Sequence, residues 1–289
     1  MTSVLVRADG VTRRFGRFTA VDQVSMQVGP SEVVGLLGAN GAGKTTLIRM
    51  LLGLLATSAG RVRVLGGLPD LNHRRRLGYV PQNLGLYRDL TVLENLTFIA
   101  RSYGAGVPTL PAEMEPHSRV LLKDLSLGMQ RRAAFIAALS HTPEVLLLDE
   151  PTSGVDALAA ASLWDTIRNQ SERGVGVLVT THNMQEAQQC DRLLLMADGQ
   201  LVAEGSEADI VGSTTAIAVR TDDWAKAFEA LNAAGAPVVL VGRAIRVADA
   251  EPEQLRRILT AAGIEATLEP VPATIEERML VLARATQAA

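Results

Sequence analysis

Residues 38 to 45 read Gly38-Ala39-Asn40-Gly41-Ala42-Gly43-Lys44-Thr45, which fits the pattern G-x-x-x-x-G-K-[ST] of a loop that binds nucleotide phosphates. The apolar run at 33–37 predicts a buried strand before this loop, and the pattern at 46–55 predicts a helix after it. Strand, loop and helix in this order are the context that the motif requires. A flexible glycine turn is the weaker alternative interpretation.

The residue types of this loop suit an anion. Glycines allow backbone N–H groups to turn inward, at the positive end of the dipole of the following helix. Lys44 supplies a mobile cation, the Thr45 hydroxyl can ligate the Mg²⁺ that accompanies the phosphates, and Thr46 can reach the next phosphate. We therefore predict a nucleotide site that contains Gly38, Asn40, Gly41, Ala42, Gly43, Lys44, Thr45 and Thr46.

A second apolar run ends in two acids, at Val145-Leu146-Leu147-Leu148-Asp149-Glu150. Four consecutive apolar residues predict a strand buried on both faces, so the acids emerge at the sheet edge where parallel-sheet proteins bind ligands. Asp149 is then placed to hold Mg²⁺, and Glu150 to accept a proton from an attacking water. A structural alternative is that the two acids cap the strand against a basic residue.

Between these two elements lies Leu125-Ser126-Leu127-Gly128-Met129-Gln130-Arg131-Arg132, which resembles the signature motif of ABC-transporter ATPases. Ser126 is also a favourable N-cap for a helix predicted over 129–139, so its hydroxyl and the Gly128 N–H suit a γ-phosphate. The resemblance covers about residues 3–211, with the family's other motifs in order. These are Phe15 in Arg14-Phe15-Gly16, Gln82 in Tyr79-Val80-Pro81-Gln82, Ser153-Gly154-Val155-Asp156, and His182 after an apolar strand at 177–181.

The resemblance implies that the chain binds and hydrolyses ATP with Mg²⁺. The metal contacts it implies are Thr45, Gln82 and Asp149. The catalytic residues it implies are Glu150 as the base, with Gln82, His182 and Lys44. It further implies that Phe15 stacks on adenine, and that Ser126, Gly128 and Met129 contact the γ-phosphate of ATP bound to a second copy.

Three of these assignments have plainer alternatives. Gln82 is an isolated glutamine of a kind usually found on the surface, and His182 could be a hydrogen-bonded histidine at a strand end. Phe15 could belong to the core, with Phe18 three residues away. In each case the position between family motifs favours the functional interpretation.

The sequence departs from the family pattern in two respects. The signature has Leu127 where most members have glycine and Met129 where glutamine is common, although the serine hydroxyl and the backbone donors remain. The segment 83–125 is shorter than the helical subdomain of most members: one helix is predicted over 91–101, and prolines and glycines then interrupt the chain. In this family the subdomain receives a helix of a membrane partner.

Composition limits the kinds of protein that fit. With 289 residues, 47% of them hydrophobic, the chain can bury one large core and a small second domain. We expect no transmembrane helix and no signal peptide, so a membrane role would require a partner. The single cysteine, Cys190, excludes an internal disulfide. A net charge of −3 argues against broad nucleic-acid binding.

After Gly212 the pattern begins again as a separate module. Strands are predicted at 216–219, 238–241, 245–247 and 264–268, and helices at 224–234 and 252–262. This β-α-β-β-α-β order predicts a small ferredoxin-like domain. It resembles C-terminal extensions of some exporter ATPases that regulate or brace a dimer; a passive cap over apolar surface is the alternative. A last helix is predicted over 274–285.

Together these patterns predict an α/β P-loop ABC-type ATPase domain at 1–212, with a shortened helical subdomain at 83–125, and a regulatory or dimerisation domain at 213–289. The expected function is the ATP-hydrolysing subunit of a membrane exporter, peripheral on the inner face of the cell membrane. Its expected partners are a second ATPase copy and an integral membrane permease, without nucleic acid. The alternative is a soluble ABC-class ATPase that acts as a switch on ribosomes or DNA.

Overall fold

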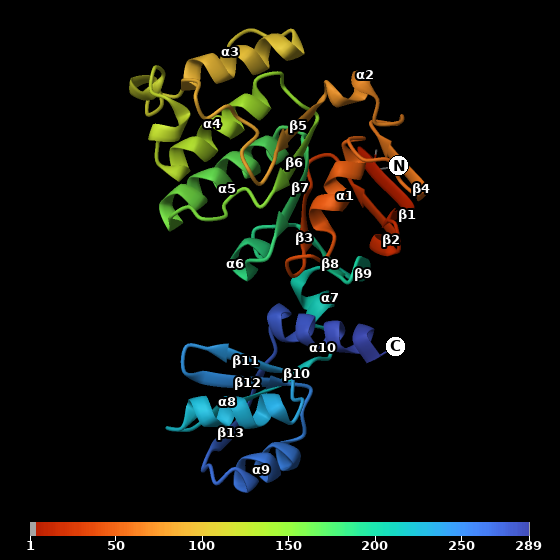
Figure 1. Cartoon of the computed structure of the whole chain (residues 1–289), viewed down its shortest axis with the longest axis vertical. Coiled ribbons are helices and arrows are strands. Elements are labelled where there is room, and N and C mark those ends of the chain that lie inside the picture. Colours follow the sequence, from red (N-terminus) through yellow and green to blue (C-terminus); the bar gives the residue numbers. More distant parts are fainter. Residues whose placement is uncertain (1–3, 289) are drawn as a thin grey trace. The chain divides into compact units, whose positions relative to one another are not determined.

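The computed structural model describes residues 4–288. It forms two compact units, which divide between Leu201 and Val202 (Figure 1). The division precedes the boundary expected after Gly212, and helix α7 (Glu207–Val211) contacts helix α10 (Ile275–Ala288), both within the second unit.

A mainly parallel sheet supports the first unit, with strand order β5-β6-β7-β3-β8-β9. The pairs from β5 through β8 are all parallel. The strands are β3 (Val33–Leu37), β5 (Leu77–Val80), β6 (Val145–Asp149), β7 (Gly176–Thr181), β8 (Arg192–Ala197) and β9 (Gln200–Gly205). The buried strands predicted before the glycine-rich loop and before the two acids are confirmed.

Both faces of this sheet are covered, which explains why its inner strands carry uninterrupted apolar runs such as 33–37 and 145–148. Leu147 packs in the cluster that includes α1 (Lys44–Leu51), whereas Leu146 and Leu148 pack in the opposite cluster with α4 (Leu127–Leu139) and α5 (Ala157–Glu172). Successive strand residues point to opposite faces, so one uninterrupted apolar run fills two cores.

An antiparallel sheet of three strands, in the order β2-β1-β4, completes the first of these cores. Its strands are β1 (Val6–Phe15), β2 (Phe18–Val28) and β4 (Ala59–Val64). Helix α1 starts two residues before the predicted position 46 and ends earlier than position 55. It ends there because Gly53, with φ +65°, takes the left-handed conformation that terminates helices.

The segment 83–125, which leads into the signature, is compact despite its shortness. Helix α3 (Val92–Tyr103) begins with a capping box between Thr91 and Glu94, and ends at Gly104. From there to α4 the chain forms only the 3₁₀ turns η1 (Glu115–His117) and η2 (Leu122–Asp124). Met114 and Leu122 are fully buried in one cluster with residues of α3 and α4, so this part of the chain has its own small core.

Two short helices lie elsewhere in the first unit, α2 (Leu71–Arg74) and α6 (Met184–Ala187).

The second unit has the predicted β-α-β-β-α-β order. Its sheet is antiparallel with strand order β11-β12-β10-β13, which is the ferredoxin-like arrangement. The elements are β10 (Thr215–Arg220), α8 (Trp224–Ala233), β11 (Val238–Val241), β12 (Ala244–Ala248), α9 (Pro252–Ala261) and β13 (Thr267–Pro272). The last strand begins later than predicted, and Ile264, which precedes it, is buried in the core of this unit.

Helix α10 is attached to this sheet by a buried carboxylate. Glu277 is 0% exposed; it forms an ion pair with Arg246 of β12 and accepts a hydrogen bond of 2.7 Å from the Thr274 N–H. A buried carboxylate is tolerated only when it is paired and hydrogen-bonded in this way. The ion pair therefore holds α10 against β12.

Replacing Glu277 by alanine should destabilise the second unit by about 3 kcal/mol, the low end for breaking a buried pair, because Arg246 retains some access to solvent. We expect amide hydrogen exchange in β12 and α10 to become roughly 100-fold faster. Glu276→Ala, at the neighbouring exposed position of α10, is the control and should change neither. Unchanged exchange in the Glu277 variant would contradict a stabilising role for the pair.

Candidate functional site

The predicted site residues follow four neighbouring parallel strands. The loops after β5, β6, β7 and β3 all leave the carboxyl edge of the sheet, where α/β proteins bind ligands. A hollow of about 420 Å³ lies there. It is lined by Phe18, Ala20, Asn40, Gly41, Gly43, Lys44, Thr45, Thr46, Gln82 and Glu150. The tertiary structure thus brings the glycine-rich loop, Gln82 and Glu150 together.

The glycine-rich loop is shaped by Gly43. Its φ is +101°, in the left-handed region, and a Cβ atom there would lie 2.4 Å from the Ala20 carbonyl oxygen. Only glycine fits such a position without strain. The turn at Gly43 starts α1 at Lys44, which places the N-terminus of that helix at the hollow.

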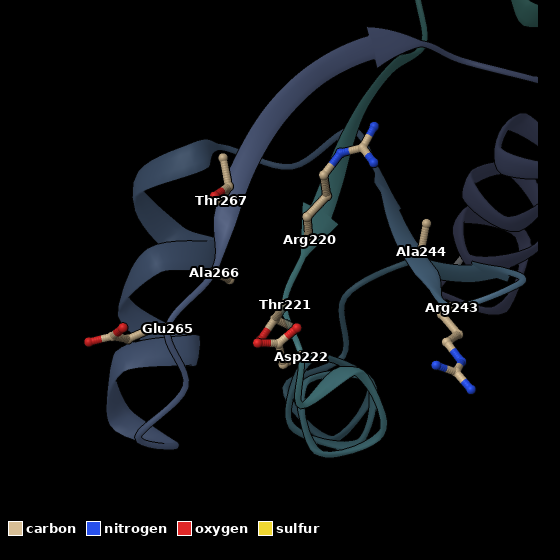
Figure 2. Close-up of a pocket in the computed structure, with 8 residues that line it drawn as sticks. All are labelled: Arg220, Thr221, Asp222, Arg243, Ala244, Glu265, Ala266 and Thr267. Carbon is tan, nitrogen blue, oxygen red and sulfur yellow. The ribbon is translucent and has the colours of Figure 1, made fainter.

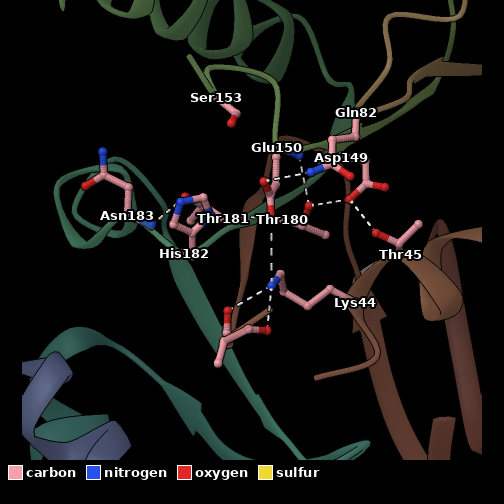
Figure 3. A network of polar contacts seen from close by, with 12 residues as sticks. Lys44, Thr45, Gln82, Asp149, Glu150, Ser153, Thr180, Thr181, His182 and Asn183 are labelled. Carbon is pink, nitrogen blue, oxygen red and sulfur yellow. Dashed lines mark hydrogen bonds and ion pairs between the residues drawn. The ribbon is translucent and has the colours of Figure 1, made fainter. Parts of the chain in front are cut away.

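Lys44 points back across its own loop (Figure 3). Its Nζ donates hydrogen bonds to the carbonyl oxygens of Gly38 at 2.8 Å and Ala39 at 3.1 Å. The side chain is buried and lies 3.9 Å from Glu150 Oε1. Burial lowers the pKa of Lys44, and the negative charges of Glu150 and Asp149 oppose that effect. An anionic phosphate in the hollow would stabilise this buried ammonium group further.

Asp149 is held at the end of β6 by two hydroxyls. Its Oδ1 accepts hydrogen bonds from Thr180 Oγ1 at 2.7 Å and Thr45 Oγ1 at 3.2 Å. Among the described residues, its Oδ2 is a buried oxygen without a hydrogen-bond partner. A carboxylate oxygen left in this state beside a threonine hydroxyl suits Mg²⁺ or a water of its shell. Thr45 and Asp149 therefore fit the metal that the sequence predicts.

Glu150 stands at the centre of the polar network in Figure 3. Its carboxylate accepts a hydrogen bond of 3.2 Å from Gln82 Nε2 and lies 3.4 Å from Nδ1 of His182, which is half exposed. Its backbone has φ +49°, a left-handed conformation that costs free energy for a residue other than glycine. The N–H of Glu150 donates to Thr180 Oγ1 at 3.0 Å, which helps to hold this strained turn. A carboxylate so placed can act as a general base.

The hollow contains a different aromatic residue from the predicted one. Phe18 lines it, whereas Phe15, its cross-strand partner in the β1–β2 hairpin, is covered by the Arg13 guanidinium at 4.6 Å from the ring centroid. Both rings are largely exposed. Phe18 therefore borders the hollow and Phe15 does not, and stacking of Phe15 on adenine stays a prediction.

The signature motif begins α4, as predicted from Ser126. The Ser126 hydroxyl accepts a hydrogen bond of 3.4 Å from the Met129 N–H, which is an N-cap contact. Within the described chain, the residues that line the hollow do not include Ser126, Gly128 or Met129. The contact of these residues with a nucleotide on a second copy stays a prediction.

Two residues that contact the site were absent from the sequence prediction. Thr180 of β7 holds Asp149 and Glu150, and Arg131 of α4 hydrogen-bonds the Ser153 carbonyl. Thr180 lies opposite Asp149 in the β6–β7 register. A polar residue near the end of an otherwise apolar strand was the only sequence signal for it.

A second hollow, of about 720 Å³, lies at one end of the C-terminal sheet. Its lining includes Arg220, Asp222, Arg243 and Glu265 (Figure 2). The side chains of Arg243 and Glu265 point away from one another in that view, and Arg220 is paired with Glu269. These charged groups do not converge as those of a binding site do.

Within residues 4–288, no cluster of three or more histidine, cysteine or acidic side chains could hold a metal ion. The expected metal contacts include a threonine and a glutamine, so this finding leaves the Thr45–Asp149 site unaffected.

None of the described helices has the length and apolar character needed to cross a membrane.

Comparisons with known proteins all match ABC transporter proteins. The family described as ABC transporter matches residues 21–153. Nod factor export ATP-binding protein I of Paraburkholderia xenovorans (strain LB400) is 40% identical over 226 residues, which cover 74% of each protein. The probable multidrug ABC transporter ATP-binding protein YbhF of Escherichia coli (strain K12) is 40% identical over 220 residues. That match covers 71% of this chain but only 38% of YbhF, so the chain spans well under half of that relative.

Solved structures are similar to the same part of the chain. An ATP-binding subunit of an ABC transporter has a TM-score of 0.66 at 28% identity, covering 72% of this chain and 92% of the other. The ADP conformation of MJ1267, an ATP-binding cassette of an ABC transporter, has a TM-score of 0.60 at 25% identity. That match covers 71% of this chain and 92% of the cassette.

Proposed function

The chain belongs to the family of ABC transporter ATP-binding proteins, and from this premise we propose that it drives export through a membrane-spanning partner. It is an ABC-type ATPase. Export is supported by the relatives, whose names specify multidrug transport or Nod factor export. The observation that carries the catalytic part is the convergence of Lys44, Asp149 and Glu150 at one edge of the sheet.

In this proposal ATP binds with its phosphates over the N-terminus of α1. Lys44 exchanges the carbonyl oxygens of Gly38 and Ala39 for phosphate oxygens. Thr45 and Asp149 hold Mg²⁺, which neutralises phosphate charge when it is bound. Glu150 accepts a proton from the attacking water. Gln82 and His182, both beside the Glu150 carboxylate, orient that water and contact the γ-phosphate.

The second element of the proposal is a head-to-tail dimer. Each ATP is held by the glycine-rich loop of one copy and by Ser126, Gly128 and Met129 of the other. Supporting this arrangement, the N-terminus of α4 offers Ser126 and free backbone donors at a positive helix end. Closure of the dimer on ATP then moves the membrane partner, and hydrolysis reopens it.

We assign the partner's docking place to the α3 region. Tyr87 and Phe98 form an edge-to-face aromatic pair with ring centroids 5.3 Å apart, and both are about half exposed. Asn95, which is buried, fixes the Tyr87 segment through hydrogen bonds to both its N–H and its carbonyl oxygen. Aromatic side chains held in this way are typical anchors of protein interfaces. This docking places the chain at the inner face of the cell membrane.

The unit after Leu201 is proposed to regulate or brace the ATPase dimer. Its ferredoxin-like sheet carries α10, while all of the residues assigned to nucleotide chemistry lie in the first unit. Removing residues 214–289 should therefore leave ATP binding intact and alter dimer lifetime.

The nucleotide site is tested by Lys44→Ala. Losing charge-assisted hydrogen bonds to phosphate should weaken ATP binding roughly 10- to 100-fold, because each such bond contributes about 1.5–3 kcal/mol. A direct fluorescence titration with a nucleotide analogue measures this. Lys123→Ala, which removes a lysine from an exposed ion pair with Asp89, is the control. Equal affinities of parent and Lys44 variant would refute the assignment.

The export function is tested separately by affinity purification of the full chain from membranes of its host. We expect a membrane-spanning protein to co-purify and to stimulate ATP hydrolysis. The Tyr87→Ala/Phe98→Ala double variant should lose most of that stimulation, at a cost of roughly 2 kcal/mol or more in partner affinity. Recovery of ribosomal proteins or DNA in place of a membrane protein would contradict export.

A further inference from the structure

A buried arginine connects the signature helix to the chain's own catalytic loop. Arg131 lies on α4, in the second turn after Ser126, and is 4% exposed. Its Nη2 donates to the Ser153 carbonyl oxygen at 3.4 Å. Ser153 belongs to the loop that follows Glu150 and donates its own N–H to the Glu150 carbonyl oxygen at 3.2 Å. Arg131 thus contacts the loop that sets the backbone of the proposed base.

The hydrogen bond to Ser153 satisfies only part of the Arg131 guanidinium. In the described part of the chain its Nε and Nη1 are buried without hydrogen-bond partners. Burial lowers the pKa of Arg131, and attraction to Glu150 is the one opposing electrostatic contribution. Burying a cation with unpaired donors costs free energy, and a group left in this state in a native structure calls for a functional explanation.

Leu127 adds a second contact between the same two segments. Gly154 has φ +79°, and a Cβ atom at that position would lie 3.0 Å from Leu127 Cδ2. The leucine that replaces the family's usual glycine in the signature therefore packs against the loop after Glu150. Helix α4 thus contacts two consecutive residues of this loop. Arg131 contacts Ser153, and Leu127 contacts Gly154.

We propose that Arg131 is a positioning residue that holds the 150–154 loop, and with it the Glu150 carboxylate, in the hydrolytic geometry. Arg131 lies on α4, and Ser126 is the N-cap of the same helix. A movement of this helix on closure of the dimer would therefore be transmitted through Arg131 to the catalytic base of the same chain. The inference rests on the proposed ATPase function and adds a residue outside the predicted site. General bases lose efficiency steeply when they are displaced, by up to about 10²-fold for 1 Å.

The test uses steady-state ATP hydrolysis and ATP binding by the full chain. Arg131→Met, of similar length but neutral, should lower kcat at least roughly tenfold while KM and the Kd for ATP stay within about twofold. Arg131→Lys keeps the positive charge and should retain kcat within about threefold. Arg168→Met on α5, which breaks a partly exposed ion pair with Asp191, is the control and should leave kcat unchanged.

A double-mutant cycle separates positioning of Glu150 from a general structural effect. If Arg131 acts through Glu150, adding Arg131→Met to Glu150→Gln should cause little further loss in single-turnover hydrolysis. If Arg131→Met does not fold, as judged by thermal unfolding, Arg131→Gln takes its place in both experiments. Full additivity with Glu150→Gln, or kcat of the neutral variant within threefold of the parent, would overturn the proposal. A parent chain that hydrolyses no ATP would instead contradict the proposed function itself.

Discussion

Glu150→Gln should retain ATP binding and lower the hydrolysis rate about 10²–10⁴-fold, the usual effect of losing a general base. The amide is isosteric with the carboxylate, so the hydrogen bond from Gln82 and the hydrogen bond from the Glu150 backbone N–H to the Thr180 hydroxyl should remain. It cannot accept the proton of the attacking water. Hydrolysis is measured by phosphate release under saturating ATP, and binding by direct titration.

The control for this prediction is Glu172→Gln, at an exposed position near the end of α5. It removes the same charge without touching the site and should hydrolyse ATP at the parental rate. A Glu150→Gln variant with turnover within a few-fold of the parent would show that another group activates water.

Ser126→Arg should prevent the ATP-dependent dimer while leaving ATP binding to the single chain largely intact. In the proposed dimer, the arginine would occupy the space assigned to the second copy's γ-phosphate. Overpacking of this kind costs roughly 1–3 kcal/mol at each position, and a head-to-tail dimer contains the position twice. We therefore expect dimer affinity to fall roughly 100-fold or more. Sedimentation of the Glu150→Gln protein with ATP, with and without the change, measures it.

Two controls separate this effect from secondary causes. Ser126→Ala removes the N-cap hydrogen bond to Met129 without adding bulk, so it should weaken the dimer far less. Ser102→Arg places the same side chain on the exposed surface of α3. Dimers that persist in the Ser126→Arg protein would show that the signature does not contact nucleotide on the other copy.

The strands and the catalytic loops were predictable because their signals are local. Apolar runs at 33–37 and 145–148, each followed directly by its functional residues, predict buried strands with a site at their carboxyl ends. The ferredoxin-like unit followed from six short patterns in order, each bounded by a glycine, a proline or a polar turn. Element boundaries differ from the prediction, as for α1, which ends at Leu51, shortly before Gly53.

The contacts that hold the catalytic groups were not predictable in this way. The hydroxyl of Thr180 reaches Asp149 because β6 and β7 are paired in one register, and the residues are far apart in sequence. The placement of Phe18 rather than Phe15 in the hollow depends on how the β1–β2 hairpin turns over the glycine-rich loop. Neither the Thr180–Asp149 contact nor the placement of Phe18 can be predicted from the spacing of residues in a sequence motif.

By itself, then, the sequence determined which elements form and which loops carry phosphate-binding and acidic groups, since periodicity, capping and glycine content act over a few neighbouring residues. Only the tertiary structure decided that Thr180 orients Asp149, that Arg131 reaches Ser153, and that Glu277 is buried against Arg246. These contacts arise from strand register and helix packing between distant segments. Their free energy depends on burial, which exists only once both sides of a contact are assembled.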